Sequence, residues 1–129
     1  SYVVQNRVAK MLEEGVNLFE NNRYDEALLK FNDAIQKDNT NAYAYYYRGL
    51  IFDEQNKTQQ AISDYVNVLK YSQEYPIANY MLAVDYDKIS KYKEACDYYK
   101  QFVLKYTQDD EYLQYAKNRL EELKQYAGK

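Results

Sequence analysis

A repeat of 34 residues is the feature that most constrains how this chain can fold. Four columns of small or apolar side chains recur in one register, so that Gly15 is followed by Gly49 and Ala83. The other columns are Ala27, Ala61 and Ala95; Leu18, Phe52 and Tyr86; and Phe31, Tyr65 and Tyr99. A unit of this length cannot bury its own apolar face and must stack on its neighbours. The sequence therefore predicts an array of similar units.

The spacing within each unit is that of two helices. In the first unit, small and apolar residues recur at steps of three and four along two segments: Met11, Gly15 and Leu18, then Ala27, Phe31 and Ala34. The polar stretch 21–23 separates the segments and is typical of a helix–helix turn. No segment alternates with period two for long enough to be a strand. We therefore predict an all-α fold, an α-α superhelix of three antiparallel helix pairs at about residues 8–41, 42–75 and 76–109.

The segment after the third unit is predicted to be one more helix, at about residues 110–127. Its apolar residues form a single stripe: Leu113, Ala116, Leu120 and Leu123. The last repeat of such an array leaves an apolar face open, and a terminal helix with a polar outer side closes it. We expect the whole chain, residues 1–129, to form a single domain with this closing helix.

This pattern resembles the tetratricopeptide repeat, in which a 34-residue helix pair carries an aromatic, Leu-Gly and Tyr, then Ala, an aromatic and a second small residue, and a closing Pro. The residues that match are Gly15, Leu18, Tyr24, Ala27, Phe31 and Ala34; Tyr45, Gly49, Phe52, Ala61 and Tyr65; and Leu82, Ala83, Tyr86, Tyr92, Ala95 and Tyr99. Three features depart from it. The closing proline is replaced by Asn39, Gln73 and Thr107, Arg48 replaces the family's leucine, and Val68 and Phe102 replace the second small residue. The resemblance covers about residues 8–109.

The composition excludes several classes of function. A net charge of −3 argues against nucleic acid and against an anionic membrane surface, because both need clustered Lys and Arg. No apolar run is long enough to cross a bilayer and none resembles a signal peptide, so the cytoplasm is the expected compartment of this segment. Because the chain begins at Ser1 and not at a methionine, one interpretation is that it is a piece of a longer protein. The single Cys96 is expected to be a buried small hydrophobe rather than a reactive thiol.

The commonest general base and the usual metal-binding and phosphate-binding motifs are missing. The chain has no histidine, one cysteine and no glycine-rich phosphate loop, so we expect neither catalysis, nor a metal, nor a cofactor. Neighbouring acids such as Asp85 and Asp87 are expected to be solvated faces of helices, because no calcium-loop spacing accompanies them.

Aromatic residues mark the candidate binding surface. The first helix of each unit carries a second apolar stripe, offset by one residue from the packing stripe, with acids at its edge. If the units stack as tetratricopeptide arrays do, this stripe lines the concave groove; extra packing between helices is the other interpretation. The candidate groove consists of Leu12, Val16, Phe19, Tyr43, Tyr46, Tyr47, Leu50, Asp53, Glu54, Ile77, Tyr80, Met81, Val84 and Asp87. Tyr46 and Tyr80 are expected to lie off the packing stripe, so that both could be removed without disturbing the fold.

The lining also excludes one use that the resemblance implies. Tetratricopeptide co-chaperones hold the acidic tails of heat-shock chaperones with a clamp of Lys, Asn and Arg. The matching positions here are Leu12, Val16, Tyr47, Ile77 and Met81. We therefore predict a protein-interaction scaffold whose partner supplies an apolar or aromatic segment with some Lys or Arg. The alternative is a structural or self-associating module that forms a homo-oligomer through exposed repeat faces, and an accessory domain of a longer enzyme ranks third.

Overall fold

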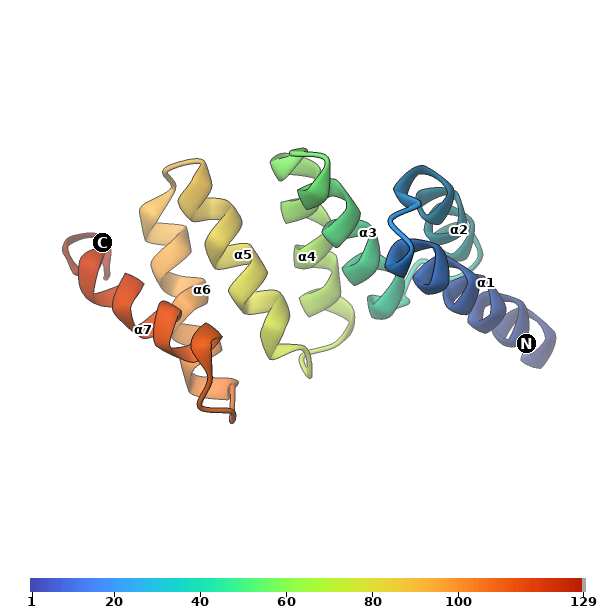
Figure 1. Ribbon diagram of the computed structural model, residues 1–129. Helices are drawn as coiled ribbons and strands as arrows, with labels where there is room; N and C mark the ends of the chain where they lie inside the picture. The colour runs from blue at the N-terminus through green and yellow to red at the C-terminus, as the bar shows by residue number, and fades with distance from the viewer. Residues whose placement is uncertain (129) are drawn as a thin grey trace. The chain divides into compact units, whose positions relative to one another are not determined.

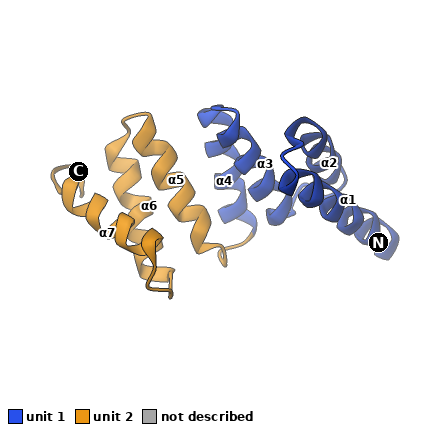
Figure 2. Ribbon diagram, viewed as in Figure 1, with its two compact units in different colours: residues 1–71 blue, residues 72–129 orange. Residues whose placement is uncertain are grey.

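The computed structural model describes residues 1–128, and within them every regular element is helical (Figure 1). The chain divides into two compact units, Ser1–Tyr71 and Ser72–Lys129 (Figure 2). The first unit holds α1 (Tyr2–Glu20), α2 (Tyr24–Lys37), α3 (Ala42–Glu54) and α4 (Thr58–Tyr71). The second holds α5 (Pro76–Lys88), α6 (Tyr92–Lys105), α7 (Glu111–Glu122) and a short 3₁₀ turn at Lys124–Tyr126. The all-α prediction of three helix pairs and a closing helix is confirmed. No helix in the part of the chain that the structure describes is both long and apolar enough to cross a membrane.

The turn inside each helix pair has the same geometry in all three repeats. Asn22, Asn56 and Ser90 adopt left-handed backbone angles, with φ of 60°, 58° and 63°. The amide that follows each of them donates to the carbonyl five residues back, as in Arg23 N to Leu18 O at 2.9 Å. This arrangement is the Schellman motif, which satisfies the last carbonyls of a helix. Asparagine tolerates the left-handed region better than most residues, so two of the three polar turns carry a suitable residue.

Side-chain caps and one proline fix where several helices begin. The side chain of Asn41 accepts a hydrogen bond from Ala44 N at 3.0 Å, and the Asp110 carboxylate accepts from the amides of Tyr112 and Leu113. Such caps satisfy amides that have no partner within the helix. Pro76 opens α5, where its missing N–H costs nothing.

Glycine and a facing ring bring the two helices of a pair close together in the first unit. A Cβ atom at Gly49 would lie 2.7 Å from Cε1 of Tyr65, and one at Gly15 would lie 2.8 Å from Cζ of Phe31. Both rings are fully buried. These small residues therefore permit the close helix approach that the repeat register predicts.

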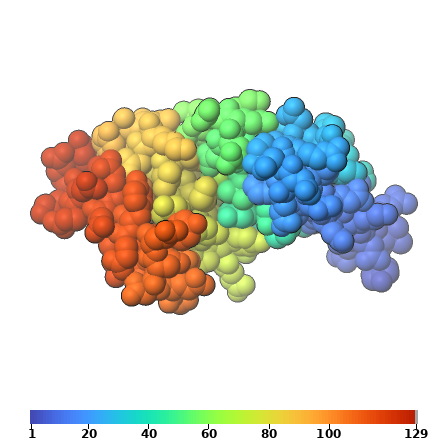
Figure 3. All heavy atoms as spheres, viewed as in Figure 1, coloured from blue at the N-terminus to red at the C-terminus, as the bar shows by residue number. Residues whose placement is uncertain are grey.

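The second unit is closed by α7, which packs on α6 and lies in front of it in the space-filling view (Figure 3). Ala116 and Leu123 are buried in the same cluster as Tyr99 and Phe102. The closing helix is shorter than predicted: α7 ends at Glu122, and residues 124–126 form a 3₁₀ turn. Cys96 is buried as predicted, and its Sγ lies 3.5 Å from the Leu123 carbonyl oxygen, so it helps hold this turn against α6.

The departures from the repeat pattern are absorbed by the core. Val68 and Phe102, which stand where a small residue was expected, are both fully buried. Arg48 makes a bidentate ion pair with the buried Asp64, with nitrogen–oxygen distances of 2.7 and 2.9 Å. It also donates to Oδ1 of Asn32, so one side chain of α3 joins α2 and α4. A polar network therefore occupies the place of the expected leucine.

The expectation that the neighbouring acids are solvated is wrong for Asp85, and a further acid, Asp64, is buried as well. Asp85 is fully buried in α5, and Asp64 is 2% exposed in α4. Burial raises the pKa of Asp64, and the Arg48 guanidinium opposes that rise. A prediction from the spacing of apolar residues assigns every charged residue to the surface. In the structure some acidic side chains are buried and interact with other groups of the chain.

Candidate partner-binding site

The first unit carries a hollow of about 750 Å³ between α1 and the start of α3. Three of the predicted groove residues, Leu12, Val16 and Tyr43, line it together with Ala9. Leu12 is 9% exposed and belongs mainly to the core, whereas Tyr43 is 38% exposed and offers its ring to solvent. The floor of this hollow is therefore apolar and rests on packed side chains.

The rim of this hollow is acidic. Glu13, Glu14, Glu20 and Asn17 complete the lining, and no lysine or arginine belongs to it. Glu14 pairs with Lys30 at 2.8 Å, and this hydrogen bond lowers the pKa of Glu14. Within residues 1–128, Glu13 and Glu20 form no ion pair. The hollow thus combines an apolar floor with carboxylates, two of which are not neutralised by a cation.

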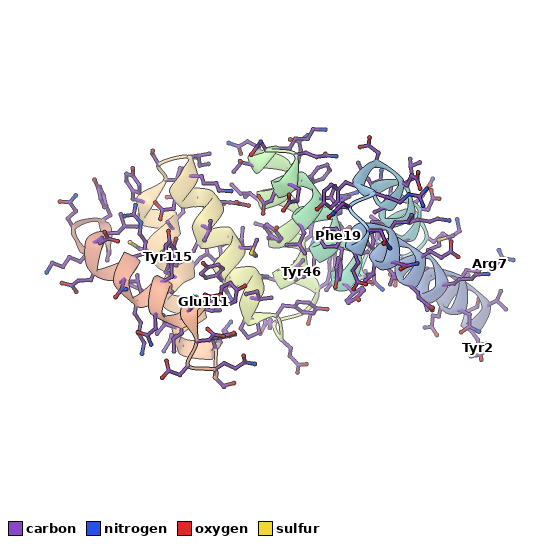
Figure 4. The ribbon with its side chains drawn as sticks, viewed as in Figure 1. Tyr2, Arg7, Phe19, Tyr46, Glu111 and Tyr115 are labelled. Carbon is purple, nitrogen blue, oxygen red and sulfur yellow. The ribbon has the colours of Figure 1, made fainter. Side chains whose placement is uncertain are left out.

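Tyr47 is the centre of an aromatic cluster rather than part of the hollow. Its ring stacks on Phe31 with centroids 5.6 Å apart and meets Phe19 edge-on at 5.5 Å. Tyr43 and Tyr46 lie against it at 4.8 and 5.5 Å. Burial, with a smaller contribution from the Tyr43 hydroxyl, raises the pKa of Tyr47 to about 12. Phe19 and Tyr47 therefore pack the second repeat on the first; Figure 4 shows Phe19 at the end of α1 next to α3.

The acids Asp53 and Asp87 occupy equivalent places in the second and third repeats and accept equivalent hydrogen bonds. The Tyr65 hydroxyl donates to Oδ2 of Asp53 at 2.6 Å, and the Tyr99 hydroxyl donates to Oδ2 of Asp87 at 3.1 Å. Arg119 of α7 also binds Asp87 in bidentate fashion, at 2.6 and 2.8 Å. Asp87 is therefore neutralised within the chain. Glu54 is exposed and Leu50 is half-buried in α3.

In the second unit the candidate surface centres on Tyr80. Its ring contacts Phe102 at 5.2 Å and Tyr99 at 6.5 Å, so it touches the packing columns. Tyr46 likewise lies 6.2 Å from Tyr65. The expectation that Tyr46 and Tyr80 lie clear of the helix-pair packing is therefore wrong. Ile77 and Val84 pack at the edge of the same cluster as Tyr80, and Met81 is half-buried in α5.

Sequence reasoning missed two tyrosines of the closing helix. Tyr112 and Tyr115 are 43% and 47% exposed and lie 5.3 and 6.1 Å from the Tyr80 ring. The signal was present, because Tyr115 continues the column of Tyr47 and Met81 at a spacing of 34 residues. Extending the register into the closing helix would have found it. Among residues 1–128 no three potential metal ligands of the Cys, Asp and Glu type are grouped.

Sequence comparison with known families agrees with this geometry. A profile of the TPR repeat matches residues 15–55, and a profile of the tetratricopeptide repeat matches residues 43–72 and 78–109. The chain belongs to the tetratricopeptide repeat family. Two of the matched segments fall on the pairs α3–α4 and α5–α6, and the first runs from the last part of α1 through α2 and α3. No curated protein matches the sequence.

Solved tetratricopeptide structures share the fold. The Arabidopsis OM64 TPR domain is similar with a TM-score of 0.83 and 21% identity, over 92% of this chain and 98% of that one. The second TPR domain of human RPAP3, in complex with the HSP70 peptide SGPTIEEVD, has a TM-score of 0.81 and 17% identity, over 94% and 98% of the two chains. The P58(IPK) TPR domain has a TM-score of 0.83 and 27% identity over 92% of this chain but 33% of its own. Tetratricopeptide domains generally mediate protein–protein interaction, and their family is typically a non-catalytic scaffold.

Proposed function

We propose that this tetratricopeptide domain is a non-enzymatic scaffold that binds an apolar or aromatic segment of a partner protein bearing lysine or arginine. The binding surface is the hollow of the first unit, where Leu12, Val16 and Tyr43 form the floor and Glu13 and Glu20 stand on the rim. The observation that carries the proposal is this pairing of an apolar floor with carboxylates and no cation. An amphipathic segment with basic flanks matches both features.

The charge of this surface favours a partner unlike those of similar domains. The RPAP3 domain was solved with the peptide SGPTIEEVD, which carries three acidic residues. At the hollow described here such a peptide would meet Glu13 and Glu20, and like charges at an interface cost affinity. Leu12 and Val16 also stand at positions where the co-chaperone clamp has polar or basic residues. This replacement likewise favours a basic partner segment over an acidic one.

A matched pair of tyrosine variants tests the location of the site. Tyr43 and Tyr71 are similarly exposed, at 38% and 36%, and each has a ring neighbour in the first unit. With an amphipathic Leu/Lys peptide as probe, Tyr43→Ala should weaken binding by about 1–2 kcal/mol, in the range of an aromatic contact at an interface, and Tyr71→Ala should not. Calorimetric titration measures both. Equal losses in the two variants would place the peptide elsewhere.

The same samples address the self-associating alternative. A peptide-binding scaffold should have one mass over a wide concentration range in analytical ultracentrifugation. If the mass rises with concentration, and a substitution on an exposed repeat face lowers it, the structural module is favoured instead.

A further inference from the structure

The second unit contains a hollow of about 260 Å³ that is lined by three tyrosines and one carboxylate. Tyr80 comes from α5, and Tyr112, Tyr115 and Glu111 come from α7. Figure 4 shows Glu111 and Tyr115 on the side of α7 toward α5. A water molecule occupies about 30 Å³ in the liquid, so this space has the volume of several water molecules and suits a single head group of a few heavy atoms.

Two of the rings are steeply inclined to the third. The Tyr112 and Tyr115 rings are inclined by 83° and 70° to the Tyr80 ring, with centroids 5.3 and 6.1 Å away. The Tyr80 ring also packs against the buried rings of Phe102 and Tyr99, and these contacts restrict its orientation. Tyr112 and Tyr115 are about half exposed and leave part of their surface accessible.

The one charged residue in the lining of this hollow is an acid. The face of an aromatic ring attracts a cation, and Glu111 adds a carboxylate, while no lysine or arginine belongs to the lining. Burial raises the pKa of Tyr80 most, and the nearby tyrosines and the charge of Glu111 raise it further. The Glu111 carboxylate therefore lies close enough to the Tyr80 hydroxyl to affect it.

We infer that these four residues form an aromatic cage for the alkylammonium head group of a lysine side chain in a partner protein. Three tyrosine rings and one carboxylate suit a cation that is large and weakly hydrated, which favours a methylated lysine over a bare ammonium. The cage goes beyond the proposed function, because it lies on the second unit and recognises a single head group. Its failure and that of the first-unit site are therefore separately observable.

The test uses the whole chain and small probes: capped lysine, capped trimethyl-lysine, capped arginine, and the uncharged tert-butyl isostere of trimethyl-lysine. Nuclear magnetic resonance follows the tyrosine ring signals during titration. Trimethyl-lysine should bind about 2- to 30-fold more tightly than its uncharged isostere, which is the range of cation–ring attraction. Equal binding of the charged probe and the isostere overturns the cage. A similar affinity for lysine and trimethyl-lysine, both above the isostere, keeps the cage and removes its preference for methylation.

Matched variants locate the effect. Tyr115→Ala and the nearly isosteric Glu111→Gln should each weaken binding of the charged probe at least threefold, whereas Tyr115→Phe keeps the ring and should retain most of it. Tyr2→Ala is the control, because Tyr2 is 77% exposed on α1 in the other unit. If Tyr115→Ala loses helical signal, Glu111→Gln and Tyr115→Phe still decide the question. Unchanged affinity in Glu111→Gln together with loss in Tyr2→Ala, or no binding of any charged probe, contradicts the proposal.

Discussion

Gly49 in α3 is predicted to be a position where adding a side chain forces a helix pair apart. A Cβ atom there would lie 2.7 Å from Cε1 of Tyr65 and 3.0 Å from two further ring atoms. The Tyr65 ring is fully buried, and its hydroxyl is held by Asp53 at 2.6 Å, so it cannot move without losing that bond. Overpacking of a core costs about 1–3 kcal/mol, and we expect Gly49→Leu to lie at the upper end of that range.

The alanine variant should cost less, and the third repeat shows why. Ala83 occupies the matching column opposite Tyr99, and the bond from Tyr99 to Asp87 is longer there, at 3.1 Å. One methyl group is thus accommodated when the ring relaxes. Replacing a helical glycine by alanine also gains about 0.5–1 kcal/mol in backbone entropy. Gly49→Ala should therefore change stability by no more than about 2 kcal/mol.

Urea unfolding followed by circular dichroism measures these differences. For a slope of about 2 kcal/mol/M, Gly49→Leu should lower the midpoint by about 1.5 M. Gln59→Leu, on an exposed position of α4, is the control for adding a leucine to a helix. A midpoint for Gly49→Leu equal to that of Gln59→Leu would refute the close contact between Gly49 and Tyr65.

Three further perturbations have defined outcomes. Deleting residues 110–129 removes the helix that covers Phe102 and Tyr99, so the protein should melt earlier or aggregate, whereas deleting the exposed residues 1–6 should leave the melting temperature nearly unchanged. Arg48→Leu leaves the buried Asp64 without its bidentate partner and should lower the free energy of unfolding in urea by about 3–5 kcal/mol. The double variant Arg48→Leu with Asp64→Leu should recover most of that loss. No recovery in the double variant would contradict the pairing. The pKa of Tyr47 is about 12 in the folded chain and 10.0 ordinarily, so the folded state binds more protons than the unfolded state between pH 10 and pH 12. The free energy of unfolding should therefore fall as pH rises from about 10 to 12, and it should fall less steeply in Tyr47→Phe.

The helices and their turns were predictable because the 34-residue register repeats the same local chemistry three times. Gly49 marks the close contact of a pair, and the polar turns at Asn22 and Asn56 suit the left-handed angle that a Schellman turn needs. These features depend on neighbours in the sequence. The end of α7 was placed too late, because an apolar stripe continues to Leu123 although the helix itself stops at Glu122.

The polar interior and part of the site were not predictable in the same way. Arg48 is compatible with a solvated face until Asp64, sixteen residues away on the next helix, is seen 2.7 Å from it. Asp87 was expected at the edge of a groove, but Arg119 and Tyr99 engage it, and both partners depend on how helices pack. Tyr115 could have been predicted, because it continues the column of Tyr47 and Met81 at a spacing of 34 residues. It was missed because the closing helix was interpreted only as a cap.

The charge selectivity of the first-unit hollow is the property on which the proposed function depends most. Calorimetric titration compares an amphipathic Leu/Lys peptide with the acidic peptide SGPTIEEVD, using the wild-type chain, Glu20→Lys and Asp97→Lys. Glu20 stands on the rim of the hollow, whereas Asp97 is an exposed acid of α6 and controls for the change in net charge. We expect the Leu/Lys peptide to bind more tightly than the acidic peptide and added salt to weaken its binding. Glu20→Lys should reduce its affinity, whereas Asp97→Lys should not. Tighter binding of the acidic peptide, or equal effects of the two substitutions, would contradict the proposed function.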